Sequence, residues 1–236
     1  MKVLALNCAS RTAGFAALDD GRIRGSLVLA EVLTRGDALA ERIEGLLSDI
    51  GWRVRDVEGI GVTRGPGSFT GVRVGLATAQ GLGFALDCPV FGLSTLELMS
   101  LSFPFAKWPV CTVLDARRGE VYAGLYDCSS GVPRDLFAEA AYSPKALLER
   151  LPRDVIVTGE GRHVLLAAAE GGDDHRLMGV DGVPGAGSVS ALGAWVTRRL
   201  REGDSPERYP PTPIYLRKPE AERRLEETPG EHERGG

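Results

Sequence analysis

Residues Thr63–Gly83 read TRGPGSFTGVRVGLATAQGLG, a glycine-rich turn that runs directly into a helix of unusually small residues. The preceding apolar run, Gly59–Thr63, suits a buried strand. Proline cannot donate to a strand ladder and glycine permits a tight turn, so Gly65-Pro66-Gly67 ends that strand. Either Ser68 or Thr70 can cap the helix that follows. The sequence therefore predicts a strand, a sharp glycine turn and a helix.

Two interpretations of this turn stay open. Helix N-termini that are approached by glycines attract anions, which suits a phosphate site. The specific phosphate templates fail, because Gly71 is followed by Val72-Arg73 and not by Lys-Ser/Thr. A dinucleotide fingerprint fails as well, because it needs glycine where Thr70 stands. The alternative is a turn whose glycines only let backbone segments pack closely.

The helix after the turn is apolar or small nearly all round from Val72 to Leu86. Its small residues recur at four-residue intervals, at Gly71, Gly75, Ala79 and Gly83. A glycine inside a helix costs roughly 1 kcal/mol relative to alanine, so these glycines need a packing reason. A row of small side chains makes a flat groove that another helix can approach closely. That helix belongs either to the same chain or to another subunit, and periodicity does not choose between them.

Whole-chain properties suit one large domain or two small ones in a cytoplasmic protein. The chain has 236 residues and a formal net charge of -4, which argues against its gripping nucleic acid alone through phosphate contacts. It has no run of ~18 apolar residues for a membrane span and no basic leader with a cleavage site. Cys8 and Cys111 lie in apolar runs without C-x-x-C pairing, so we expect buried free thiols.

The first part of the chain alternates strand and helix patterns. In chain order we expect strands at Met1–Leu6, Gly14–Leu18 and Arg22–Leu29, a helix at Asp37–Ile50 capped by Asp37, and, after the small-residue helix, a strand at Val90–Leu93 and a helix from Thr95. The first three strands form an antiparallel meander. Strands, a helix, and then strand–helix–strand are typical of a ribonuclease-H-like α/β half.

A second unit begins near Pro104. It contains a hairpin of Val110–Ala116 and Glu120–Asp127, a helix at Ser143–Leu151, a strand at Val155–Val157, and helices at His163–Ala169 and Ser190–Arg201. The glycine- and aspartate-rich stretch 171–187 is predicted to be an irregular surface loop. We expect domains at 1–103 and 104–216, followed by a charged and disordered tail at 217–236.

The segment Gly65–Leu86 resembles the signature segment of the bacterial TsaB (YeaZ) family. Further blocks follow in family order at Pro89–Glu97, Leu114–Tyr122 and Pro213–Arg217, and less closely at Val3–Ser10. The resemblance implies two ribonuclease-H-like α/β domains of the superfold shared by actin, hexokinases and Hsp70. It also implies that the second domain is smaller and degenerate, and that helix 188–202 packs back on the first domain.

The same resemblance implies a non-catalytic subunit of the machinery that makes threonylcarbamoyladenosine on tRNAs reading codons that begin with adenine. There, TsaD transfers the threonylcarbamoyl group, TsaB pairs with TsaD through helices of their first domains, and the ATPase TsaE joins them. ATP and metal are then expected on the partner subunits and none on this chain alone, with tRNA reached only through the complex. The interface residues implied are Val72, Arg73, Gly75, Leu76, Ala79 and Gly83.

The residues themselves offer little chemistry. Nucleotide-hydrolysing members of the superfold place an aspartate at the end of the first strand, and by resemblance Asn7 stands at that position. An amide cannot supply the negative charge that a hard cation requires. The histidines, His163, His175 and His232, are scattered outside any metal-binding spacing. We therefore expect no metal ligand and no catalytic residue in this chain.

Two groups of residues are the candidates for a binding site. The glycine-turn motif consists of Gly65, Pro66, Gly67, Ser68, Thr70 and Gly71. At the predicted hairpin, Asp115, Arg117 and Glu120 form either a salt-bridged turn or, by resemblance, contacts in a cleft between the domains, together with Asn7 and Ser10.

Two other classes of function also stay open. One is an enzyme, either a weak ATPase or a metallopeptidase-like protein. The other is a self-associating regulatory homodimer, which would use the same helix face.

Overall fold

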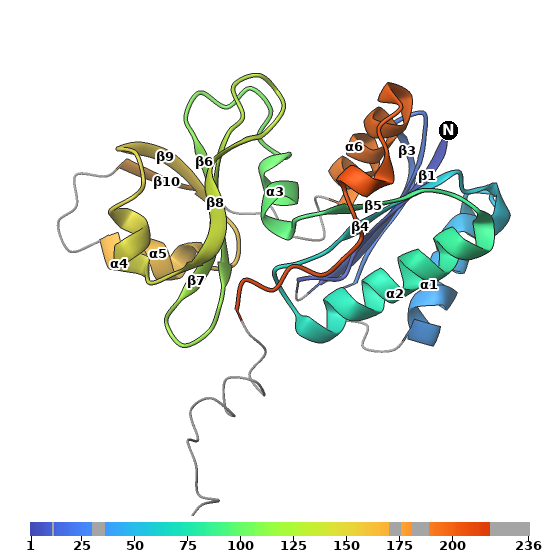
Figure 1. The fold of residues 1–236 in the computed structure, drawn as a ribbon, viewed down its shortest axis with the longest axis horizontal. Coiled ribbons are helices and arrows are strands. Elements are labelled where there is room, and N and C mark those ends of the chain that lie inside the picture. Colours follow the sequence, from blue (N-terminus) through green and yellow to red (C-terminus); the bar gives the residue numbers. More distant parts are fainter. Residues whose placement is uncertain (11, 30–35, 170–175, 181–188, 218–236) are drawn as a thin grey trace, which may run out of the picture.

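The computed structural model describes residues 1–10, 12–29, 36–169, 176–180 and 189–217. Within them the chain forms two five-stranded sheets with helices against their faces (Figure 1). The strand order is β3-β2-β1-β4-β5 in the first sheet and β10-β9-β6-β7-β8 in the second. Counted from the first strand of each sheet, both orders read 3-2-1-4-5, so the two halves repeat one topology. This is the α/β architecture that the sequence predicts.

The first sheet combines the predicted meander with parallel strands. Its strands are β1 (Lys2–Asn7), β2 (Ala13–Asp19), β3 (Arg22–Leu29), β4 (Gly59–Thr63) and β5 (Val90–Leu93). β1 pairs antiparallel with β2 and parallel with β4. Every residue of β4 is buried, because helices cover both faces of the sheet there.

Three helices cover the first sheet. Against one face lie α1 (Gly36–Asp49) and α2 (Phe69–Leu86), whose apolar residues share a core with β1 and β4. Against the other face lies α6 (Val189–Glu202), which contacts β1, β2 and β4 (Figure 1). The helix predicted at Asp37–Ile50 thus begins and ends one residue earlier. The side chain of Asp37 lies outside the described part of the structure.

The second sheet contains two strands that the sequence analysis missed. Its strands are β6 (Val110–Asp115), β7 (Val121–Asp127), β8 (Arg134–Tyr142), β9 (Asp154–Thr158) and β10 (Arg176–Val180). β6 and β7 form the predicted antiparallel hairpin. The prediction of a loop over 171–187 is wrong at β10, which pairs in parallel with β9. The remainder of that stretch, 171–175 and 181–187, lies outside the described residues.

Two short helices, α4 (Pro144–Leu148) and α5 (Arg162–Ala169), pack on one face of the second sheet. The helix α3 (Thr95–Ser100) lies between the two sheets (Figure 1). Its side chains pack on the second sheet in a core that includes Leu96, Met99 and Tyr126. Single-turn 3-10 helices, η1 (Val54–Asp56) and η2 (Pro206–Arg208), complete the fold.

After η2 the chain runs as an extended segment across both halves, and we call residues 209–217 the C-terminal strap. The amide of Gly92 donates to the carbonyl of Tyr209 at 2.7 Å, so the strap covers the outer edge of β5. The amide of Ile214 donates to the carbonyl of Arg64 at 2.7 Å. At the end of the strap, Arg217 donates to the carbonyl of Ala116 at 2.9 Å on the second half. The strap therefore ties the two halves together. The tail predicted to be disordered is 217–236, and residues 218–236 lie outside the described residues. The prediction is wrong at Arg217, which is bonded to the second half.

Cys8 and Cys111 are buried free thiols, as predicted, and burial raises the pKa of each to about 12. Among the described residues, no helix combines the length and the hydropathy that a membrane span requires.

Candidate functional site

The glycine turn is held under the loop that follows β1. Ser68 is the N-cap of α2, and its hydroxyl accepts a hydrogen bond from the Gly71 amide at 3.2 Å. The Ser68 amide itself donates to the carbonyl of Ala9 at 2.7 Å. Thr70, the alternative cap, is an exposed residue inside the first turn. The amides of Ser68 and Gly71 are therefore already engaged within the chain.

Two glycines of the turn are required by close approach of the backbone. A Cβ on Gly67 would lie 2.0 Å from the carbonyl oxygen of Ala9, and a Cβ on Gly71 would lie 2.1 Å from that of Cys8. Gly65 precedes Pro66 in a cis peptide bond, and both residues are buried. Of the two interpretations of the turn, these contacts favour close packing of backbone over a phosphate cradle.

A cleft of about 620 Å³ opens between the two halves beside this turn. Its lining consists of Ala9, Ser10, Gly67, Ser68, Leu114, Asp115, Ala116, Arg117, Tyr122, Glu160 and His163. Of the five cleft contacts expected from the sequence, Ser10, Asp115 and Arg117 do line it. Clefts of this volume between domains are common positions for ligand sites.

Asn7 and Glu120 do not line the cleft. Asn7 is fully buried at the end of β1, where its Oδ1 accepts hydrogen bonds from the Thr63 hydroxyl at 2.9 Å and the Ala9 amide at 3.1 Å. Its amide oxygen holds the loop in place. Glu120 instead forms an ion pair with Arg217 of the strap.

Tyr122, which belongs to the block Leu114–Tyr122 of the family resemblance, lines the cleft too, whereas sequence reasoning missed Glu160 and His163. The signal for both is the second strand-to-glycine turn, Thr158-Gly159-Glu160-Gly161, which follows β9 as the first glycine turn follows β4. Because the two sheets repeat one topology, equivalent turns of both halves face the same cleft.

The hairpin turn between β6 and β7 is a polar turn braced by its own aspartate. The Arg117 amide donates to Asp115 Oδ1 at 2.7 Å, and the Arg117 guanidinium lies 3.7 Å from the same carboxylate. Arg117 and Arg118 both have positive φ, 64° and 56°, which is uncommon for residues with a side chain. The two contacts of Asp115 therefore compensate for the backbone strain of the turn, which agrees with the interpretation of a salt-bridged turn.

The small-residue row of α2 faces the chain's own sheet. Gly75 is buried with Cys8 beside it, Ala79 is fully buried, and a Cβ on Gly83 would lie 2.3 Å from Val90. Val72 and Leu76 are also buried in this core. Five of the six expected interface residues therefore pack inside the single chain, and only Arg73 is exposed. The prediction that this row of small residues is the surface for a partner is therefore wrong, because the row packs on the chain's own sheet.

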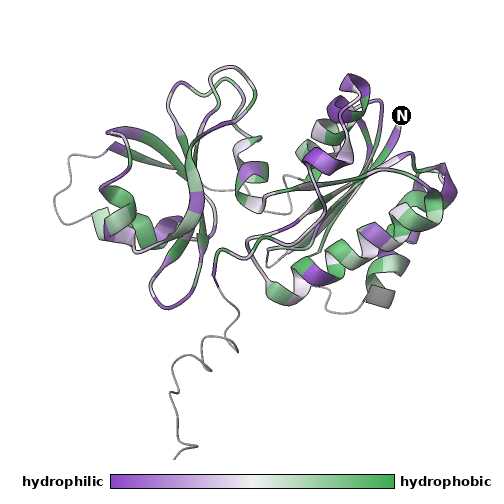
Figure 2. Cartoon of the chain, in the orientation of Figure 1, coloured by the Kyte–Doolittle hydropathy of each residue, from purple (hydrophilic) through white to green (hydrophobic). Residues whose placement is uncertain are grey.

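The opposite side of α2 is exposed. In Figure 2 the ribbon of α2 is mainly green and white with a few purple residues, so most of its residues are hydrophobic or near neutral. We define the outer face of α2 as Phe69, Thr70, Arg73, Ala77, Gln80, Gly81, Phe84 and Ala85. Phe84 has 93% of its surface exposed and Phe69 has 44%. The strap borders this face, because Tyr215 stacks on Phe69 with ring centroids 5.6 Å apart.

Ionisable side chains gather at the boundary between the two halves. The Tyr126 hydroxyl, fully buried on β7, donates to Glu139 Oε1 at 2.7 Å. Burial, with Asp135 and Glu139 close by, raises the pKa of Glu97 on α3 to about 7. Burial also raises the pKa of Glu139. The folded chain therefore keeps a proton on Glu97 at a pH where a free carboxyl is ionised.

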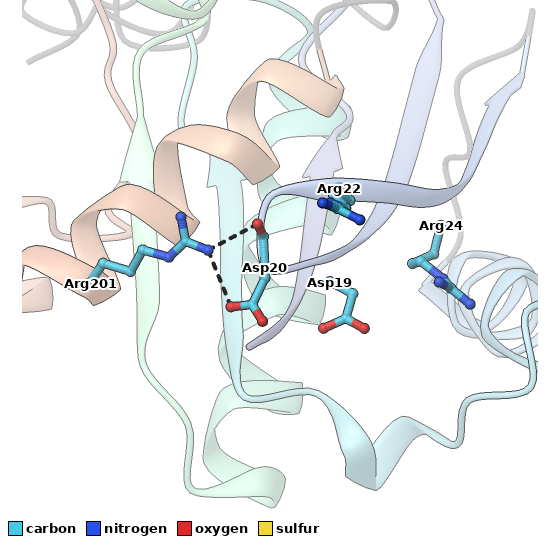
Figure 3. Close-up of a pocket in the computed structure, with 5 residues that line it drawn as sticks. All are labelled: Asp19, Asp20, Arg22, Arg24 and Arg201. Carbon is cyan, nitrogen blue, oxygen red and sulfur yellow. Dashed lines mark hydrogen bonds and ion pairs between the residues drawn. The ribbon is translucent and has the colours of Figure 1, made fainter.

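A second pocket, of about 500 Å³, lies on the first half and is lined by Asp19, Asp20, Arg22, Arg24 and Arg201 (Figure 3). Arg201 donates to the carbonyl of Asp20 at 3.0 Å and to its carboxylate at 3.2 Å. Hydrogen bonds from the N-terminal ammonium group and from Arg201 hold the pKa of Asp20 below its usual range. The charges of Asp20 and Arg201 are thus paired with each other within the chain.

The repeated sheets with a cleft between them define a protein of the two-domain, ribonuclease-H-like superfold. The activator of 2-hydroxyisocaproyl-CoA dehydratase from Clostridium difficile, solved with bound ADPNP, shares this fold with a TM-score of 0.52 and 9% identity, over 86% of this chain and 97% of that chain. That likeness shows the fold alone.

Within the superfold, a model of the family described as "TsaD: tRNA N6-adenosine threonylcarbamoyltransferase" matches residues 36–224. The chain belongs to this TsaD-related family and, within it, to the TsaB (YeaZ) group. YeaZ from Pseudomonas aeruginosa matches with a TM-score of 0.72 and 26% identity, over 91% of this chain and 99% of that chain.

Two curated relatives are named tRNA threonylcarbamoyladenosine biosynthesis protein TsaB. The one from Bacillus subtilis (strain 168) is 34% identical over 137 residues, which is 56% of this chain and 58% of the relative. The one from Escherichia coli (strain K12) is 30% identical over 158 residues, which is 64% of this chain and 66% of the relative. The matched stretch therefore spans less than two thirds of either relative.

A metal-bound nucleotide does not fit the residues of the cleft. At the end of β1 the neutral amide of Asn7 is turned to Thr63 and Ala9, and the cleft carboxylates Asp115 and Glu160 come from the second half. In the described ranges, no group of three or more His, Cys, Asp or Glu side chains could hold a metal ion. The glycine turn, which would approach the phosphates, is packed on Cys8 and Ala9.

Proposed function

We propose that this chain is a non-catalytic subunit of the machinery that makes threonylcarbamoyladenosine on tRNA, in which it pairs with a TsaD-type transferase. The names of the TsaB relatives and the match to the TsaD family support the pathway. The chemistry of the cleft supports the non-catalytic role, because Asn7 stands where the superfold's nucleotide enzymes need an acid. ATP and metal then belong to the partner subunits, TsaD and TsaE, and tRNA is reached through the complex.

The observation that carries this proposal is the outer face of α2. The exposed aromatic surface of Phe84 is unfavourable in water, and burial against a partner removes that free-energy cost. Ala77, Gly81 and Ala85 recur at four-residue intervals beside it and leave room for a helix to approach. The proposed interface is therefore the exposed stripe of α2, on the opposite side from the buried row of Gly75, Ala79 and Gly83.

The test is to mix the purified chain with TsaD from the same organism and to measure the mass of the complex by light scattering. We expect a heterodimer that supports tRNA modification once TsaE, ATP and the donor threonylcarbamoyl-adenylate are added. Phe84→Glu is expected to abolish the complex, because it places a carboxylate in the apolar contact. The variant should melt like the wild type, since the side chain touches little of its own chain.

Phe105→Glu is the matched control, because Phe105 is also an exposed phenylalanine, 75% accessible, on the other half of the chain. Its complex should have wild-type affinity. If the folded wild-type chain forms no complex with TsaD, the proposed pairing is wrong. A homodimer that persists when TsaD is in excess would support self-association in its place.

A further inference from the structure

Arg73 is the only charged residue of the eighteen in α2. Its guanidinium stacks on the ring of Phe69, with Cζ 3.7 Å from the ring centroid. Its Nε donates to the hydroxyl of Tyr215 at 3.0 Å. The side chain is therefore held between the first turn of the helix and the C-terminal strap, near the N-terminal end of the outer face of α2.

The clamp is rigid because the strap is anchored on both sides of Tyr215. Ile214, the preceding residue, is bonded to Arg64, and Gln80 Nε2 of α2 donates to the carbonyl of Pro211 at 2.9 Å. On the other side, Arg217 is bonded to Ala116. The Arg73 side chain therefore has little conformational freedom left to lose when a partner binds it, which favours affinity.

Nothing in the described part of the chain neutralises this guanidinium. No carboxylate of a described residue lies within 4.0 Å of its nitrogen atoms, and both of its ring neighbours are uncharged. A guanidinium is a planar fork of five N–H donors that matches a carboxylate in a two-point contact. The Nε bond to Tyr215 leaves the terminal nitrogens for such a contact.

We propose that Arg73 is the specificity-determining residue of the outer face of α2 and receives a carboxylate from a helix of the partner subunit. This inference rests on the proposed function, since it concerns the same surface. Charge complementarity selects the occupant, because an apolar face with a single fixed cation fits an apolar face with a single acid. A second copy packed α2 on α2 offers no acid from within that helix, which contains neither Asp nor Glu, and only the exposed Asp87 at its C-cap.

The experiment measures the dissociation constant of the complex with TsaD for Arg73 variants at low salt and at about 0.5 M salt. Arg73→Gln is expected to weaken binding about 10- to 100-fold and to remove most of its salt dependence. Arg73→Lys keeps the charge but loses the fork and the stacking, so we expect an intermediate loss. Tyr215→Phe keeps the ring and removes the hydroxyl, and a loss of a few-fold would identify Tyr215 as a positioning residue.

The control is Arg176→Gln, which removes an exposed arginine from β10 and should leave the dissociation constant unchanged. Thermal unfolding verifies that each variant is folded. The inference is overturned if Phe84→Glu abolishes the complex while Arg73→Gln binds like the wild type, and the proposed function then stands. It is also overturned if Arg73→Gln disrupts only a homodimer of this chain. Failure of the wild type to bind TsaD overturns both proposals.

Discussion

Gly71 lies where the first turn of α2 crosses the end of β1. Gly71→Ala would place a methyl group 2.1 Å from the Cys8 carbonyl oxygen, and backbone atoms cannot give way as a flexible side chain does. We expect this variant to lose about 2 kcal/mol or more of unfolding free energy, measured by urea denaturation of the isolated chain.

Gly81→Ala is the matched control, because it lies on the same helix with no atom within 4 Å of the added methyl group. It should gain about 0.5–1 kcal/mol from helix propensity and a less flexible unfolded chain. Equal effects of the two alanines would contradict the packing role assigned to Gly71.

Glu97 makes stability depend on pH near neutrality. Its pKa is about 7 in the folded chain against an ordinary value of 4.5. Between those values the folded chain binds more protons than the unfolded one, so stability falls as pH rises from about 4.5 to 7 and then levels. The groups that face it are Asp135 and Glu139 of β8, Arg64 after β4, Arg199 of α6 and Tyr126 of β7.

The glutamine in Glu97→Gln cannot ionise, so the unfolding free energy of this variant should not fall over this pH range. We expect it to be more stable than the wild type by roughly 1–3 kcal/mol at pH 8 and by little at pH 4. Denaturant titrations at a series of pH values measure the difference. Glu41→Gln, on the exposed side of α1, is the control. A constant difference between Glu97→Gln and the wild type at every pH would contradict the buried-carboxyl account.

At the scale of elements, the strap is the connection most open to a direct test. Arg217→Ala removes the hydrogen bond to Ala116 and the ion pair with Glu120. We expect a loss of about 1–2 kcal/mol, seen as faster hydrogen exchange in the hairpin turn 115–121 and at the Ile214 amide.

Arg208→Ala is the comparison, because the exposed side chain of Arg208, on η2, pairs with Asp204, which keeps its ion pair with Arg199 when Arg208 is removed. Such a pair contributes little, so exchange in the hairpin should not change. An unchanged hairpin in Arg217→Ala as well would show that the strap does not hold the second half.

Elements with strong periodicity or clear turn signals were predictable from the sequence. The glycine turn, the Ser68 cap and α2 follow from local chemistry, as does the hairpin of β6 and β7. β8 was missed because RDLFAEAAY mixes charges and alanines along a strand at the edge of its sheet. β10 was missed because its five residues stand in a glycine-rich stretch and gain their structure by pairing with β9.

The candidate site was less predictable, because it depends on which surfaces meet. Periodicity located the small-residue row of α2 but could not tell that Cys8 and Val90 lie against it. Likewise, Glu160 and His163 meet Ser10 only when the two halves are placed side by side. Local signals specify each element, while contacts between distant segments decide which face of it is free.

At the scale of the whole molecule, the first half depends on the last helix of the chain. α6 supplies Leu192, Trp195 and Val196 to the core on one face of the first sheet. A chain ending after residue 180 should lose hydrogen-exchange protection in β1, β2 and β4, since that face would be open to water. The strands β6 and β7 should keep their protection, while the turn between them, 115–121, exchanges faster because Arg217 is missing.

A chain ending after residue 203 retains α6 and is the control for this truncation. It should protect β1, β2 and β4 as the full chain does, with faster exchange near the edge of β5 that the strap covers and in the hairpin turn 115–121 that Arg217 contacts. Full protection of the first sheet in the shorter chain would show that α6 is dispensable there.

The position of α6 also sets an order on synthesis. Strands β1 to β5 leave the ribosome first, yet the helix that closes one side of their sheet is translated after the entire second sheet. The second half can therefore fold while the first is still open, against the usual order in which N-terminal domains fold first. A nascent chain halted before residue 189 has a complete second half and an incomplete first half. In that chain Val3, Ala5 and Leu18, which α6 buries in the full chain, are still exposed to water.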